Sequence, residues 1–237
     1  MLHILNKSIK DFFSLKILLI TFVPAILGLL LWGSVIYYYG QELYNWTLGL
    51  MPEWLMSVKF LGNILNIVLA LIVYTLLGLW LVLMILLTNV FFSIFYTPLI
   101  VSFVRKKDFP HIPQSGFGTL GECLGEFFKN LCIFVPLFIL SFLLYFIPLL
   151  GSTLGFIALL VLGYLFFKSN MFYDIGSSCM DKVQFENLNQ TYRLKNHSYA
   201  LLAYLPSFVP FLNFFLMPLQ MLIITHYFFT HIHIKMK

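Results

Sequence analysis

Two long stretches of this chain carry no charged side chain, and each is broken near its middle by proline beside a turn former. Residues 130–167 contain Ile147-Pro148-Leu149-Leu150-Gly151, and residues 196–234 contain Val209-Pro210-Phe211-Leu212-Asn213. One helical crossing of a bilayer needs about 20 apolar residues. Stretches nearly twice that long, with breakers near the middle, predict two helical hairpins, over 131–167 and 199–230.

Paired, interrupted apolar segments are a sequence sign of a transport site. Broken helices expose backbone dipoles at membrane depth, and the helix that restarts after a break points its positive end at an anion. This predicts that residues at the two turns lie near a pore: Pro148, Gly151, Ser152, Pro210 and Asn213.

The composition places the whole chain in a membrane. Hydrophobic residues make up 61% of the 237 positions and charged residues 10%, against about 25% charged in soluble proteins. We therefore expect an all-α integral membrane protein with a single domain over 1–237. The block 17–39 is 23 residues long, longer than the cleavable core of a signal peptide, so it predicts a retained transmembrane helix.

Basic residues at the ends of the apolar blocks predict the topology. They account for the net charge of +5 through the positive-inside rule, so nucleic acid is not an expected partner. The rule places both termini and Arg105-Lys106-Lys107 in the cytoplasm. Residues 60–104 are uncharged, and two crossings there would move these cations outside. One long helix over about 61–104, bending at Thr97-Pro98, is therefore expected.

Between these blocks, residues 118–129 have the spacing of an amphipathic helix that lies on the membrane surface and leads into the first hairpin. Gly116, Gly118 and Gly121 satisfy a dinucleotide-binding pattern, but no strand precedes them, so we interpret the segment as a flexible link. His226, His231 and His233 do not share a helix face, so no metal site is expected. No catalytic set emerges, and we expect neither an enzyme nor a cofactor; Asp174 and Asp181 form the only faint pair.

Several segments resemble the CysZ sulfate permease family, whose superfamily includes the etoposide-induced membrane protein. The resemblance rests on the order and spacing of three pieces, supported by an N-terminal third with a similar layout. The pieces are Tyr145-Phe146-Ile147-Pro148-Leu149-Leu150-Gly151, Met171-Phe172-Tyr173-Asp174, and Val209-Pro210-Phe211-Leu212-Asn213-Phe214-Phe215-Leu216-Met217-Pro218.

The resemblance implies an oligomeric inner-membrane protein that admits sulfate for cysteine biosynthesis. It assigns anion binding to Ser14, Leu15 and Lys16, where the family has a Gly-Leu-Arg-type motif. Lysine keeps the charge but loses the bidentate fork of arginine. Arg105 and Lys168 are candidates for drawing anions to the entrance.

Two interpretations of the function remain open at this stage. In the first, the chain is a channel-like facilitator for sulfate or a related oxyanion. In the second, it is a membrane scaffold of the same superfamily that transports nothing.

Overall fold

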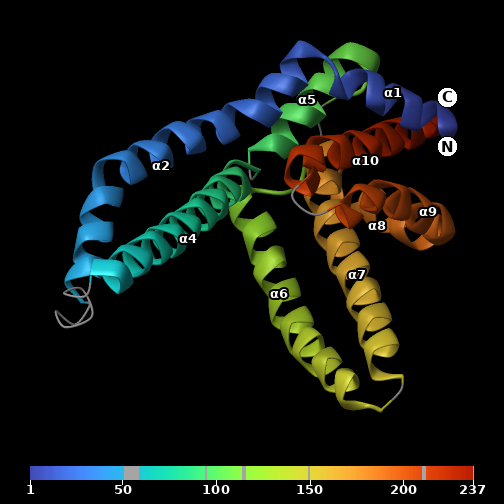
Figure 1. Cartoon of the computed structure of the whole chain (residues 1–237). Helices are drawn as coiled ribbons and strands as arrows, with labels where there is room; N and C mark the ends of the chain where they lie inside the picture. The colour runs from blue at the N-terminus through green and yellow to red at the C-terminus, as the bar shows by residue number, and fades with distance from the viewer. Residues whose placement is uncertain (51–58, 94, 114–115, 149, 210–211, 237) are drawn as a thin grey trace. The chain divides into compact units, whose positions relative to one another are not determined.

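The computed structural model describes residues 1–50, 59–93, 95–113, 116–148, 150–209 and 212–236, and all regular elements in these ranges are helices. Five of the described helices are long and apolar enough to cross a bilayer: α2 (Leu15–Gly49), α4 (Lys59–Ser93), α6 (Leu120–Leu143), α7 (Gly151–Cys179) and α10 (Leu212–Met236). The predicted all-α, multi-pass membrane fold is confirmed (Figure 1).

The described residues form two compact units, residues 1–18 with 95–237 and residues 19–94. The second unit is a pair of helices, α2 and α4, joined by polar and aromatic contacts. Trp32 donates its indole N–H to Thr88 at 3.1 Å and packs edge-on against Trp80. The predicted helix 17–39 exists and extends to residues 15–49. That the chain is one domain stays a prediction.

The single helix expected over 61–104 is wrong, because two helices occupy this range. The helix α4 ends at Ser93, and α5 (Tyr96–Asp108) begins after a break that precedes the expected bend at Thr97-Pro98. Pro98 is the third residue of α5. An amide in the first turn of a helix has no intrahelical partner, so proline is tolerated at this position.

The first hairpin forms as predicted, from α6, a short 3₁₀ turn η1 (Leu144–Phe146) and α7. Gly151 lies in the turn and donates its N–H to the carbonyl of Ile147 at 2.8 Å. A separate surface helix at 118–129 is not observed. Thr119 and Glu122 form a capping box that begins α6, so the amphipathic residues become the first turns of that helix.

The second hairpin has unequal arms. Its first arm is α9 (Arg193–Tyr204), followed by the 3₁₀ turn η2 (Leu205–Phe208) and α10. The 12 residues of α9 span about 18 Å, too short for a hydrocarbon core of about 30 Å. Before it lies α8 (Lys182–Thr191), which Asp181 caps through a 2.8 Å bond from the Gln184 N–H.

The helix α10 forms the core of the first unit. It packs against α1 (Leu2–Phe12), α5, α7 and α9, and its residues 220–229 are all buried. Tyr96 of α5 belongs to this core, and burial raises the pKa of its phenol to about 12. The packing of α1 on α10 fixes the junction between α1 and α2. The predicted anion motif lies at this junction.

Candidate anion site

A sharp turn between α1 and α2 holds the predicted motif. The Ser14 N–H donates to the carbonyl of Asp11 at 3.0 Å, which closes α1, and the Ser14 carbonyl accepts from Leu18 N–H at 3.0 Å, which opens α2. Ser14 therefore stands immediately before the first turn of a membrane-spanning helix. The first amides of a helix have no intrahelical acceptor, and they favour an anion.

Ser14 contributes a hydroxyl that needs a partner. Its Oγ is buried, and no described residue forms a hydrogen bond with it. A buried polar atom without a partner costs about 1–3 kcal/mol, and most such atoms in proteins are satisfied. An oxyanion oxygen beside Ser14 would accept this hydrogen bond.

Positive charge lies at the same turn. Lys16 Nζ stands 5.8 Å from the ring centroid of Phe103, and Lys107 Nζ stands 5.6 Å from the same ring. Lys107 forms an ion pair with Asp11, whereas Lys16 has no carboxylate partner among the described residues. The Lys16 ammonium is thus available to an anion, and Leu15 beside it is exposed.

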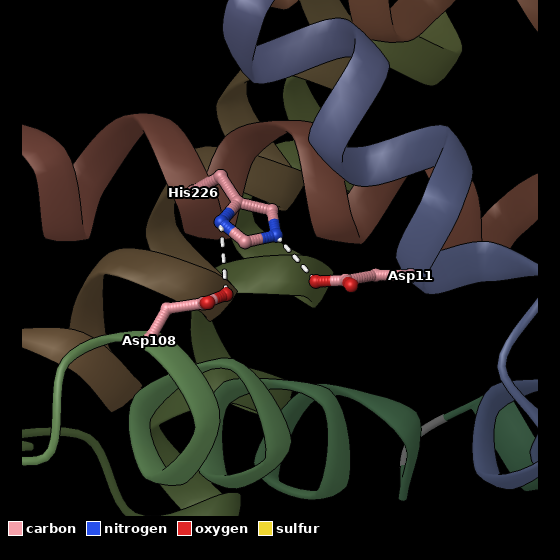
Figure 2. A group of neighbouring side chains, drawn as sticks. All are labelled: Asp11, Asp108 and His226. Atoms are coloured by element: carbon pink, nitrogen blue, oxygen red, sulfur yellow. Dashed lines mark hydrogen bonds and ion pairs between the residues drawn. The ribbon is translucent and has the colours of Figure 1, made fainter.

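A group of three side chains from three helices anchors this turn (Figure 2). His226 of α10 lies between Asp11 of α1 and Asp108 of α5, with its Nε2 2.9 Å from Asp11 Oδ2 and its Nδ1 4.0 Å from Asp108 Oδ2. Asp11 and His226 are each 1% exposed. The contacts fix the end of α1 against α10.

These three residues could offer ligands to a metal ion, but two lysines already balance their charge. Lys107 pairs with Asp11, and Lys7 lies 3.1 Å from Asp108. Two ammonium groups against two carboxylates leave no net negative charge to attract a divalent cation. The other two histidines of the tail are not part of the group; His233 instead lies 2.7 Å from His111.

The predicted turn residues are held by separate contacts in the two hairpins. Gly151 is buried and Ser152 is exposed, and Pro148 offers its carbonyl to Leu150 N–H. Asn213 accepts bonds from Ser207 and Gln220 at 3.2 and 2.8 Å. Pro210 lies outside the described residues. That these residues line a pore stays a prediction.

The two predicted entrance cations occupy different environments. Arg105 of α5 has a buried Nε without a hydrogen-bond partner among the described residues. Lys168 of α7 contacts His197 of α9. The contact of Asp11, Asp108 and His226 was not predicted from the sequence. The one sequence signal was His226 itself, a histidine within the uncharged stretch 196–234.

The glycine-rich segment 116–121 packs tightly against α7. The N–H groups of Phe117 and Gly118 both donate to the Ser177 carbonyl, at 2.8 and 3.2 Å. A Cβ on Gly118 would lie 2.6 Å from the Ser177 side chain. Glycine at this position therefore allows the segment to approach α7 closely. The segment also borders a cavity of about 570 Å³ that Pro98, Val101 and Ser178 line.

Asp174 and Asp181, the faint pair, have unrelated contacts. Asp174 accepts a hydrogen bond from Thr97 of α5, and Asp181 caps α8. Neither contact resembles paired acid–base chemistry.

Residues 4–218 match the family described as sulfate transporter CysZ/etoposide-induced protein 2.4. This match covers most of the chain, so the chain belongs to that family, as the resemblance predicted. No curated protein matches the chain significantly in sequence.

Proposed function

We propose that this member of the CysZ/EI24 family is a channel-like facilitator for sulfate or a related oxyanion, acting in the inner membrane and feeding sulfur assimilation. The observation that carries the proposal is the buried, unpartnered hydroxyl of Ser14 at the start of a membrane-spanning helix. The ammonium of Lys16, two residues further on, supplies the charge. Family membership supports the same substrate class.

The chemistry of the turn suits a tetrahedral oxyanion. Hydroxyl and backbone N–H donors satisfy several oxygens without a buried counter-charge, and the helix N-terminus adds a favourable dipole. Lysine acts as a point charge and does not impose the planar geometry that arginine would. Ser14, Leu15 and Lys16 are therefore the proposed binding residues, while Arg105 and Lys168 remain proposed entrance charges.

The membrane potential opposes the entry of a dianion, and consumption of the anion inside the cell can drive passive uptake. A dianion moving inward against 100 mV meets about 4.6 kcal/mol, twice the value for one charge. Intracellular use of the anion can maintain the gradient that offsets this cost. Sulfate flux that occurs only under an imposed proton gradient would contradict the facilitator mechanism.

Radiolabelled sulfate uptake into liposomes containing the purified chain tests the proposal. We expect Lys16→Ala to lower uptake at limiting sulfate about tenfold, the loss for one charge-assisted contact of about 1.5 kcal/mol. Ser14→Ala should lower it several-fold. The control is Lys10→Ala, which removes the same charge from an exposed position on α1.

The variants separate a specific site from a general charge effect. Equal losses in Lys10→Ala and Lys16→Ala would exclude the proposed site. A folded wild-type protein that moves no sulfate, sulfite, thiosulfate or molybdate would favour the alternative, a membrane scaffold that transports nothing. Cross-linking in the same liposomes tests the proposed homo-oligomer.

A further inference from the structure

Three basic side chains gather where α9 packs on α7. Lys168 Nζ lies 2.9 Å from His197 Nε2, and Arg193, four residues before His197 on α9, shares a face of that helix with it. Gly163 permits this close packing, since a Cβ there would lie 2.7 Å from the Tyr204 hydroxyl. The cluster therefore belongs to a fixed helix–helix contact.

The hydrogen bonds around His197 define its protonation. The Tyr164 hydroxyl donates to the His197 carbonyl at 3.2 Å and so accepts from the ring Nδ1–H at 2.8 Å. The remaining ring nitrogen, Nε2, accepts from the Lys168 ammonium. Burial, followed by the charges of Lys168 and Arg193, lowers the pKa of His197, in agreement with a neutral ring.

No acidic group balances this cluster. None of the ion pairs among the described residues includes Lys168 or Arg193. The two charges that lower the pKa of His197, those of Lys168 and Arg193, are both positive. Two cations held near each other beside a partly buried imidazole repel one another, and a bound anion would relieve this repulsion.

The position of the cluster suits a lipid headgroup. From Gly151 to Phe167 α7 carries no charge, and these 17 residues span about 26 Å, nearly the hydrocarbon thickness of about 30 Å. Lys168 follows directly, at the level where headgroups lie. Leu194 and Leu201 of α9 are 83% and 52% exposed, and Leu205 at the start of η2 is 52% exposed, which offers apolar surface to acyl chains beside the cations.

We propose that Lys168 and Arg193, with His197 holding the Lys168 ammonium in place, form a binding site for a phosphate-type oxyanion, whose position favours the phosphodiester of an anionic phospholipid as the source. Basic groups between helices on the cytoplasmic side are a known means of binding such headgroups. The site is separate from the sulfate-binding residues Ser14 and Lys16, although Lys168 is also a proposed entrance charge, and lipid binding is measured without transport.

Native mass spectrometry of the detergent-purified full chain tests the lipid source, with phosphatidylglycerol and zwitterionic phosphatidylcholine as probes. The test variant is Lys168→Gln with Arg193→Gln. The control, Lys106→Gln with Lys182→Gln, removes the same charge from exposed positions. Each cation near a headgroup contributes about fivefold in affinity, so the test variant should bind phosphatidylglycerol about 25-fold more weakly, and the control should match the wild type.

A second arm examines free anions. Inorganic phosphate is added to the same proteins, and the thermal unfolding midpoint is measured. A rise in the wild type and control but not in the test variant, together with equal binding of the two lipids, would support the site and identify a free oxyanion as its ligand.

Two controls keep the test decisive. Lys168→Arg retains the charge and should retain binding, which distinguishes a lost site from a misfolded protein. If the test variant and the control bind phosphatidylglycerol equally and also respond equally to inorganic phosphate, the proposal is overturned. Sulfate flux is measured separately with Lys16→Ala, so loss of transport and loss of this site cannot be confused.

Discussion

Asp11 shows how one buried side chain determines the position of a helix. Its carboxylate joins Lys107 of α5 and His226 of α10, and it is 1% exposed. Asp11→Ala leaves both partners unsatisfied and should destabilise the protein by about 3 kcal/mol, the lower end for a broken buried pair, because Lys107 is 44% exposed and can regain water. Thermal unfolding should shift by about 6–12 °C.

The control for Asp11 is an exposed pair of the same type. Glu126 and Lys129 form an ion pair on the surface of α6, and such pairs contribute about 0–1 kcal/mol. A Glu126→Ala shift as large as that of Asp11→Ala would contradict the buried anchor.

His197 should make stability depend on pH. Its pKa in the folded protein lies below the ordinary 6.5 because of burial, Lys168 and Arg193. The unfolded chain therefore binds the proton more readily, so this contribution is complete above about pH 6.5 and is lost as the pH falls through the lowered folded value. Unfolding measured between pH 7.5 and 5.5 should show a smaller loss in His197→Gln than in the wild type.

The control for the pH dependence of stability is His3→Gln, which replaces an exposed histidine. This variant should keep the pH dependence of the wild type. An unchanged pH dependence in His197→Gln would show that other groups are responsible.

Contacts between residues far apart in the chain were the hardest feature to predict from the sequence. The Ser14-Leu15-Lys16 motif was found through a family resemblance, and the structure adds a buried hydroxyl there. Asp11 and His226 are separated by 215 positions, so no local period or spacing connects them. Their contact depends on how α1 packs on α10, which is a tertiary property.

Among the helical elements, the turn of the first hairpin depends on one glycine. A Cβ on Gly151 would lie 2.5 Å from the Leu144 carbonyl oxygen and 2.8 Å from that of Tyr145. Since backbone must move to make room, Gly151→Ala should destabilise the protein by about 1–3 kcal/mol. Thermal unfolding measures the loss.

Gly125 in α6 provides the matched control, because a Cβ there meets no atom within 4 Å. Alanine is the better helix former by up to about 1 kcal/mol, so Gly125→Ala should leave stability unchanged or raise it. Equal destabilisation by both substitutions would exclude the steric explanation for Gly151.

Elements were predicted well where a strong breaker marks the boundary. Pro148 and Gly151 indicated the first hairpin, because proline and glycine act on the backbone locally. The break between α4 and α5 was not predicted; a bend at Thr97-Pro98 was expected instead, but Pro98 fits within the first turn of α5 and does not itself end a helix. The short arm α9 was missed because its apolar residues continue the pattern of its neighbours.

At the scale of the first unit, α10 differs from the other candidate spans. Of its most apolar window, 67% is buried inside protein, against 11–22% for the other four spans found in the described residues. It buries Gln220, Thr225 and His226, polar groups that lipid would not satisfy. Protein therefore surrounds α10, whereas the other four spans leave most of their apolar surface exposed.

The burial of α10 bears on how many helices cross the bilayer. The helices α1 and α10 pack side by side, and Lys7 on α1 reaches Asp108 at the end of α5. Both chain ends are therefore expected on one side, which requires an even number of complete crossings. Five described helices have the length, so we expect that one of them does not cross completely, and its burial favours α10.

Reporter fusions test this topology. A fluorescent protein that folds only in the cytoplasm and a phosphatase active only outside are each fused before Met1 and after Lys237. We expect fluorescence and no phosphatase activity at both ends, because Arg105, Lys106 and Lys107 lie beside α1 in the same unit and favour the cytoplasm. Ends on opposite sides would mean that α10 crosses completely, with its polar residues shielded by protein throughout the bilayer.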